Sequence, residues 1–169
     1  MEKDWISGLL GQWSGELNLW SVLFRLMLSL VLSAVIGCER SSKRHSAGLR
    51  TFILVSLVGT GTMLIDQYLM LLYKSPLPVL SAAGVIGTAT LSSNSVLFSS
   101  KSQIKGLTTS VGLWCCGVVG IALGAGMYTV ALGLTLSMLA CMSSLPALEK
   151  DLKDRSNHFE VHLELKNKS

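Results

Sequence analysis

Two ionisable residues interrupt long apolar stretches of the sequence. Arg25 lies in the stretch 17–37 and Asp66 in the stretch 51–73, each about 12 to 14 residues from the end nearer the intervening basic segment. In a helix this distance is about 18 to 21 Å. An unpaired charge at that depth in a membrane costs at least about 2.5 kcal/mol. We therefore predict an ion pair between Arg25 and Asp66; the alternative is that each side chain reaches outward to water.

A second set of candidate residues lies in two polar turns. The first turn contains Gly37-Cys-Glu39-Arg40 and Ala47-Gly48-Leu49-Arg50-Thr51, and the second reads Lys105-Gly106-Leu107-Thr108-Thr109. Each turn places a basic residue, a Gly and a Thr at the start of an apolar helix, where unpaired N–H groups attract anions. We predict a site for a lipid phosphate or a partner's carboxylate, formed by Glu39, Arg40, Gly48, Arg50, Thr51, Lys105, Gly106, Thr108 and Thr109.

Glu39 is an acid within a basic turn, and the sequence allows two interpretations of it. In the first, Glu39 pairs with Arg50 and holds the turn in one conformation. In the second, the turn is an ordinary basic loop and Glu39 is solvated.

Other kinds of chemistry find little support in the sequence. There is no HExxH segment, no nucleophile beside a base and no phosphate-binding loop, so we expect neither an enzyme nor a cofactor. The cysteines lie in or beside apolar runs without CxxC spacing or a nearby His, and we expect them to pack as small hydrophobic residues and to bind no metal. They are Cys38, Cys115, Cys116 and Cys141.

The composition indicates the elements that position these residues. Of 169 residues, 50% are hydrophobic and 14% are charged, whereas a soluble domain carries about a quarter charged residues. About 20 apolar residues span the hydrocarbon core of a bilayer. We therefore predict an all-α membrane protein with a membrane domain over 17–146 and about five transmembrane helices, near 17–37, 51–73, 77–98, 107–124 and 127–146.

The two ends of the chain differ from this membrane domain. Residues 1–16 read as an interfacial amphipathic helix, because its aromatic and leucine residues continue into the first stretch with a spacing of three or four. Residues 147–169 form a hydrophilic tail in which 159–165 alternates as a strand does. A single strand is not stable alone, so it either pairs with the same strand of another copy or stays unpaired.

The basic residues give the orientation, because Lys and Arg in short loops stay cytoplasmic. With five spans and the N-terminus outside, eleven Lys and Arg residues are cytoplasmic and two, Lys3 and Lys74, are outside. The net charge of +4 then reflects topology and contact with anionic lipid, and no nucleic-acid partner is expected.

Small and hydroxyl residues gather in two of the stretches. Gly117, Gly120 and Gly124 share one helix face, which favours a close helix crossing within the chain or in a homo-oligomer. The third stretch is rich in hydroxyls, which either line a polar path or bond to carbonyls of their own helix. They are Thr88, Thr90, Ser92, Ser93 and Ser95, with Asn94.

The GCER segment, the AGLRT segment, the GLTT segment with Trp114, and Arg25 placed 14 residues before Glu39 together resemble the MgtC/SapB family over roughly residues 25–145. The resemblance implies a bacterial inner-membrane protein linked to magnesium limitation, acid or host stress, with some members regulating other membrane machinery. The third stretch departs from the family, because the Asp, Arg and Gln of the family's DPxR-AAQ segment are absent and most glycines of its Gly-rich segment are Ser or Thr here. Residues 159–165 look like the first strand of the family's ACT-like domain.

The sequence favours a regulator or interaction partner of other membrane machinery, with the lipid bilayer and another membrane protein as partners. The alternative is a transporter of Mg²⁺ or another small ion or solute through the hydroxyl-lined path. A dehydrated Mg²⁺ requires several oxygen ligands, and Asp66 alone is present at depth.

Overall fold

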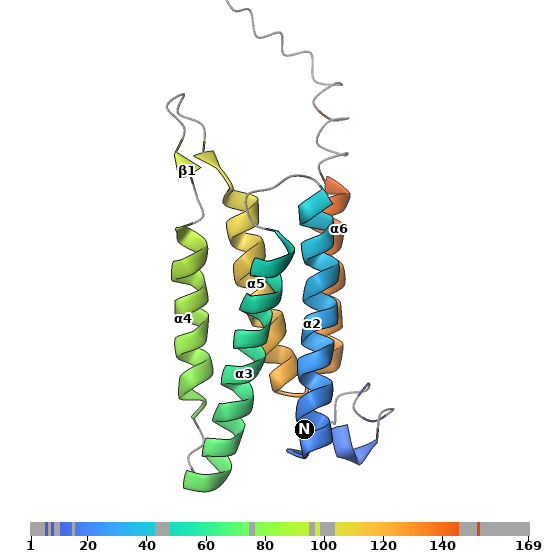
Figure 1. Ribbon diagram of the computed structural model, residues 1–169, viewed down its shortest axis with the longest axis vertical. Coiled ribbons are helices and arrows are strands. Elements are labelled where there is room, and N and C mark those ends of the chain that lie inside the picture. Colours follow the sequence, from blue (N-terminus) through green and yellow to red (C-terminus); the bar gives the residue numbers. More distant parts are fainter. Residues whose placement is uncertain are drawn as a thin grey trace, which may run out of the picture.

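The computed structural model describes residues 11–14, 16–42, 48–74, 77–94, 97–98 and 104–145, together with Ile6, Gly8 and Leu152. Its main elements are the helices α2 (Leu19–Ser42), α3 (Leu49–Tyr73), α4 (Val79–Ser93), α5 (Leu107–Gly124) and α6 (Tyr128–Ser143) (Figure 1). Helices α2, α3 and α5 are long and apolar enough to cross a membrane, and α4 and α6 are apolar but shorter, with 15 and 16 residues. The all-helical membrane fold expected from the composition is confirmed.

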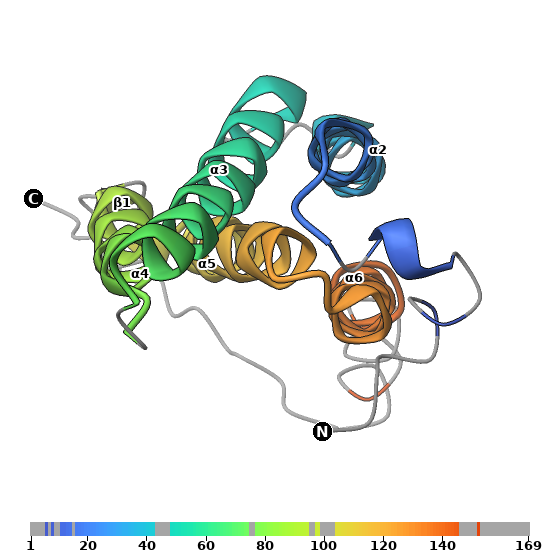
Figure 2. The same ribbon diagram turned by 90° about the horizontal axis from the view of Figure 1, so that it is seen from below.

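Successive helices run in opposite directions, so their connections gather at two ends of the bundle (Figure 1). We call the end where α2 finishes and α3 and α5 begin the basic end, after Arg40 and Arg50. The opposite end carries Trp13 in the 3-10 helix η1 (Gln12–Ser14) and Trp20 at the start of α2, and we call it the Trp end. Viewed from the Trp end, α5 lies between α3 and α4 on one side and α6 on the other (Figure 2).

Helices α3 and α5 cross at their glycines. A methyl group on Gly120 would overlap the carbonyl oxygen of Ser56, and one on Gly59 would overlap that of Gly117. Thr60 Oγ1 donates a hydrogen bond to the Gly120 oxygen at 3.0 Å across the crossing. The predicted close approach is confirmed with α3 as the partner helix. A homo-oligomer through the same glycine face would need a surface that α3 already occupies.

Helix α2 is longer than the sequence predicted and ends at Ser42. Glu39 and Arg40 therefore lie on the helix, and their predicted place in a turn is wrong. No Gly or Pro breaks the helix after Gly37, and Arg40 in its last turn complements the partial negative charge of a helix C-terminus. Gly37 faces α3 so closely that an added Cβ would lie 2.8 Å from Leu49 Cα.

The two predicted terminal elements fall mostly outside the described residues. Of the interfacial helix over 1–16, the structure describes Ile6, Gly8, residues 11–14 and Glu16. Ile6 and Gly8 are helical, and residues 12–14 form a 3-10 turn that follows Gly11 at φ 95°. The expected helical face does not continue into α2, because residues 16–18 are not helical. The predicted strand 159–165 lies outside the described residues.

The hydroxyls of α4 bond mainly to their own helix. Thr88 Oγ1 donates to the Val85 oxygen at 3.0 Å, Thr90 Oγ1 to that of Ile86 at 2.6 Å, and Ser92 Oγ to that of Thr88 at 2.6 Å. Of the two alternatives for this stretch, the structure therefore favours local bonding. After α4 the chain forms a short antiparallel pair that the sequence analysis missed, β1 (Leu97–Phe98) and β2 (Ile104–Lys105).

Candidate functional site: two buried charges at helix ends

Arg25 is buried near the Trp end of α2, with 1% of its surface exposed. Its guanidinium donates four hydrogen bonds, all to uncharged acceptors. Nη1 donates to Gln67 Oε1 at 2.9 Å and to the Gly124 oxygen at 2.7 Å. Nη2 donates to the Ser14 oxygen at 2.9 Å, and Nε donates to the Tyr128 hydroxyl at 3.3 Å. These acceptors come from η1, α3, α5 and α6, so Arg25 joins four separate segments.

Helix ends supply the negative potential that Arg25 needs. Gly124 is the last residue of α5 and Ser14 the last of η1, and carbonyls at a helix C-terminus lack intrahelical partners and carry partial negative charge. The turn that follows α5 contains Gly126 at φ 79°. An added Cβ there would lie 3.1 Å from Arg25 Nη2, so a glycine at this position leaves room for the guanidinium.

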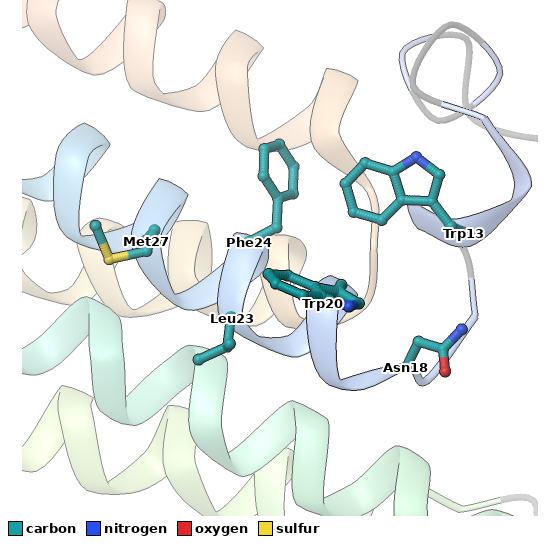
Figure 3. A pocket seen from close by; sticks show the side chains of 6 residues that line it. All are labelled: Trp13, Asn18, Trp20, Leu23, Phe24 and Met27. Atoms are coloured by element: carbon teal, nitrogen blue, oxygen red, sulfur yellow. The ribbon is translucent and has the colours of Figure 1, made fainter.

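The Ser14 carbonyl is the point where the segment before α2 is held. It accepts hydrogen bonds from Arg25, from the Tyr128 hydroxyl at 3.0 Å and from Ser21 Oγ at 3.1 Å. Beside it, the Trp13 and Phe24 rings meet edge to face at 5.6 Å, and Phe24 and Tyr128 meet at 5.9 Å. Trp13 and Phe24 also line an apolar pocket of about 500 Å³ with side chains of early α2 (Figure 3).

Asp66 is buried on α3, with 2% of its surface exposed, and its carboxylate caps the start of α4. Oδ1 accepts from the Leu80 N–H at 2.9 Å, and Oδ2 accepts from the Ser81 N–H at 2.5 Å and the Ser81 hydroxyl at 2.7 Å. Residue 78, which precedes α4, is a proline and provides no side-chain cap. Asp66 therefore performs from a neighbouring helix the role that an Asp or Ser N-cap ordinarily performs locally.

The predicted ion pair between Arg25 and Asp66 is wrong. Both residues lie toward the Trp end, as their matched depth indicated, but no ion pair joins them in the described part of the chain. Each charge meets the end of a helix with the opposite partial charge, which compensates it without a countercharge. Two features of the sequence relate to these partners: the Gly124-Ala-Gly126 turn and the proline before α4, which provides no side-chain cap. Neither identifies the partner of a buried charge until the positions of the helices are known.

At the basic end, Arg40 is buried with 3% of its surface exposed. Its Nε donates to Met142 Sδ at 3.1 Å and lies 3.7 Å from Glu39 Oε2. The ion pair that the structure shows for Glu39 is thus with its neighbour Arg40, whereas the sequence interpretation paired it with Arg50.

The rest of the two motifs forms the surface of the basic end. Arg50, Thr51 and Thr108 are exposed there, and Thr109 is buried. Thr51 Oγ1 donates to the Gly48 oxygen at 2.7 Å, and Gly106 precedes α5 at φ 91°. The structure describes only the backbone of Lys105. Both motifs therefore lie at one end of the bundle, and the anion or partner site proposed for them stays a prediction.

The geometry bears on metal chemistry as well. Both Asp66 oxygens already accept hydrogen bonds from α4, and the described residues contain no group of three or more His, Cys, Asp or Glu side chains that could hold a metal ion. The arrangement at the Trp end is thus suited to joining segments and compensating charge.

Comparison with known proteins agrees with the family resemblance found in the sequence. A family model described as "MgtC family" matches residues 26–151. The chain is 26% identical over 147 residues to a candidate magnesium transporter, YhiD of Escherichia coli K12, and 26% identical over 156 residues to SapB of Bacillus subtilis. It is 31% identical over 125 residues to MgtC of Brucella abortus. These alignments cover 83%, 85% and 74% of this chain and 68%, 65% and 51% of the relatives. No solved structure matches.

Proposed function

This chain belongs to the MgtC family, and from that premise we propose that it is a regulator or interaction partner of other membrane machinery when magnesium is limiting or the cell is under stress. It is a membrane protein of the MgtC type. The relatives are longer than the matched region, so the proposal concerns this membrane domain.

One observation carries the proposal: the Asp66 carboxylate, which lies within the apolar helices, already accepts hydrogen bonds from α4. Mg²⁺ takes about six oxygen ligands in octahedral geometry, and proteins usually hold it with one or two carboxylates. Within the five helices the acids are Glu39, near the basic end, and Asp66. Asp66 is committed to the N-terminus of α4 and Glu39 lies beside Arg40. This distribution supports a protein that binds other membrane components over one that passes Mg²⁺ through its centre.

The working surface in this proposal is the basic end, with the exposed Arg50, Thr51 and Thr108. It lies on the cytoplasmic side of a bacterial inner membrane, with the N-terminus outside, because basic residues in short loops are retained in the cytoplasm. Its partners are anionic lipid headgroups and a second membrane protein. No catalytic activity and no cofactor belong to this proposal.

The second candidate function is transport of Mg²⁺ or another small ion or solute. It is favoured by the name of the Escherichia coli relative, a candidate magnesium transporter. Reconstitution in liposomes that contain a Mg²⁺-sensitive dye separates the two functions. The regulator gives no uptake above empty liposomes, whereas saturable uptake by the wild-type chain would establish transport.

A matched pair of variants tests the surface. Arg50→Gln and Lys74→Gln each remove one exposed positive charge, at the basic end and at the Trp end respectively. We expect Arg50→Gln to lose growth support in low magnesium and its crosslinks to a membrane partner, while Lys74→Gln keeps both. Membrane levels of the two variants are compared by immunoblot. Full activity of Arg50→Gln at a normal membrane level would contradict the proposal.

A further inference from the structure

Helices α5 and α6 are joined at the Trp end and stand apart at the basic end (Figure 1). Between them lies a groove of about 610 Å³, lined largely by apolar side chains. Its lining also includes four sulfur-containing side chains, Cys115 from α5 and Met138, Cys141 and Met142 from α6. The remaining side chains with polar atoms in the groove are the hydroxyls of Thr108 and Ser137.

The spacing of these residues brings the sulfurs onto one surface. Residues 138, 141 and 142 share a helix face because positions three and four apart are neighbours, and Cys115 faces them across the groove. Cys115 and Cys141 thus line the same groove from two different helices. Cys115 is half-buried and Cys141 is exposed at the surface of the bundle. The adjacent Cys116 is buried and directs its thiol to the Phe52 carbonyl oxygen at 3.5 Å.

We propose that this groove is a site for a soft monovalent metal ion, Cu(I) or its analogue Ag(I), held by the sulfurs of Cys115 and Cys141 with Met138 as a third ligand. Thiolate and thioether sulfurs select such ions, whereas Mg²⁺ and Ca²⁺ require oxygen ligands that the groove does not assemble. Binding displaces one proton from each thiol. Two thiolates and one monovalent cation leave the complex with a single negative charge.

A buried cation stands beside the groove to offset that charge. Arg40 reaches from α2 to the wall of the groove, where its Nε donates to Met142 Sδ at 3.1 Å. Glu39 Oε2 lies 3.7 Å from the same nitrogen and takes up part of the positive charge. Because Glu39 carries the opposite charge, the Arg40 guanidinium offsets the charge of the complex only in part. Arg40 thus acts through charge and donates no ligand.

The test uses the full chain, purified in detergent under anaerobic conditions and titrated with Ag⁺ and with Cu(I) against a chromophoric chelator. We expect one ion per chain. Cys115→Ser and Cys141→Ser are each expected to weaken binding by at least about 100-fold, beyond the 10- to 100-fold that outer-shell changes produce. Cys38→Ser removes an exposed cysteine of α2 that does not line the groove, and we expect it to bind as the wild type does.

X-ray absorption of the loaded wild-type chain provides a readout that does not depend on the folding of any variant. We expect a coordination shell of sulfur. A shell of oxygen or nitrogen, unchanged affinity in both groove variants, or equal loss in Cys38→Ser would each overturn the proposal. The inference does not rest on the proposed regulatory function, since the groove and the working surface share only Thr108 and metal binding is measured without a partner.

Discussion

Arg25 and Asp66 are buried to a similar extent, carry opposite charges and lie toward the same end of the bundle, yet they serve the fold differently. Asp66 accepts its hydrogen bonds from one turn, at Leu80 and Ser81. Arg25 donates to η1, to α3 and to both sides of the α5–α6 turn, which lie far apart in the sequence. A carboxylate concentrates its acceptors in one place and suits a single helix N-terminus, whereas the fork of a guanidinium reaches several acceptors at once.

The largest effect is expected for Arg25→Ala. The change leaves the Gly124 and Ser14 carbonyls with fewer donors and separates η1 from the α5–α6 turn. Each unsatisfied buried group costs about 1 to 3 kcal/mol, so we expect a loss of about 3 kcal/mol or more. Thermal unfolding in micelles measures it. Arg25→Lys should recover part of the loss, because an ammonium keeps the charge without the fork. An Arg25→Ala chain as stable as the wild type would contradict the conclusion that Arg25 holds several segments together.

A smaller and more local effect is expected for Asp66→Ala. Loss of a helix cap costs about 0.5 to 2 kcal/mol, and the effect should concentrate at the start of α4. Hydrogen exchange at Leu80 and Ser81 should accelerate while the Trp13 region keeps its protection. Asp66→Asn serves as the matched control, because an amide oxygen still accepts from the helix N-terminus. Faster exchange across the whole bundle would show that Asp66 has a wider role than a cap.

The smallest expected quantity is the coupling between the two charges. Since they share no hydrogen bond, the losses in Arg25→Ala and Asp66→Ala should add in the double variant to within about 0.5 kcal/mol. All four chains are unfolded under the same conditions to obtain this value. A coupling energy well above about 1 kcal/mol would show that the two charges interact directly, as the sequence predicted.

The sequence was informative wherever a residue's role depends on its own helix. The depth of Arg25 and Asp66 and the close approach at Gly120 follow from spacing along one element, and the local bonding of Thr88 is one of the two alternatives that the sequence left open. The helical bounds of α2 were harder to predict, because charged residues such as Arg40 resemble a loop until the dipole at the helix C-terminus is considered.

The partners of the buried charges could not be predicted in the same way. Ser14, Gly124 and Tyr128 meet Arg25 only after four segments have packed, and a carbonyl oxygen has no signature in the amino-acid sequence. Ionisable side chains are visible in a sequence and therefore favoured the prediction of an ion pair, whereas the partial charges of helix ends emerge only with the tertiary fold. The sequence predicted that Cys115 and Cys141 bind no metal, because they lack CxxC spacing; that they line one groove emerges only when α5 and α6 are packed.

The bond from Arg25 to the Gly124 carbonyl spans 99 positions of the chain. At synthesis rates of about 5 to 20 residues per second, the α5–α6 turn emerges roughly 5 to 20 s after Arg25. During that interval the first helix carries a charge whose final partners do not yet exist. Membrane insertion of this protein therefore has an order built into it: α2 reaches its final environment only when the last hairpin arrives, and a chain interrupted before Gly124 holds an arginine without two of its acceptors.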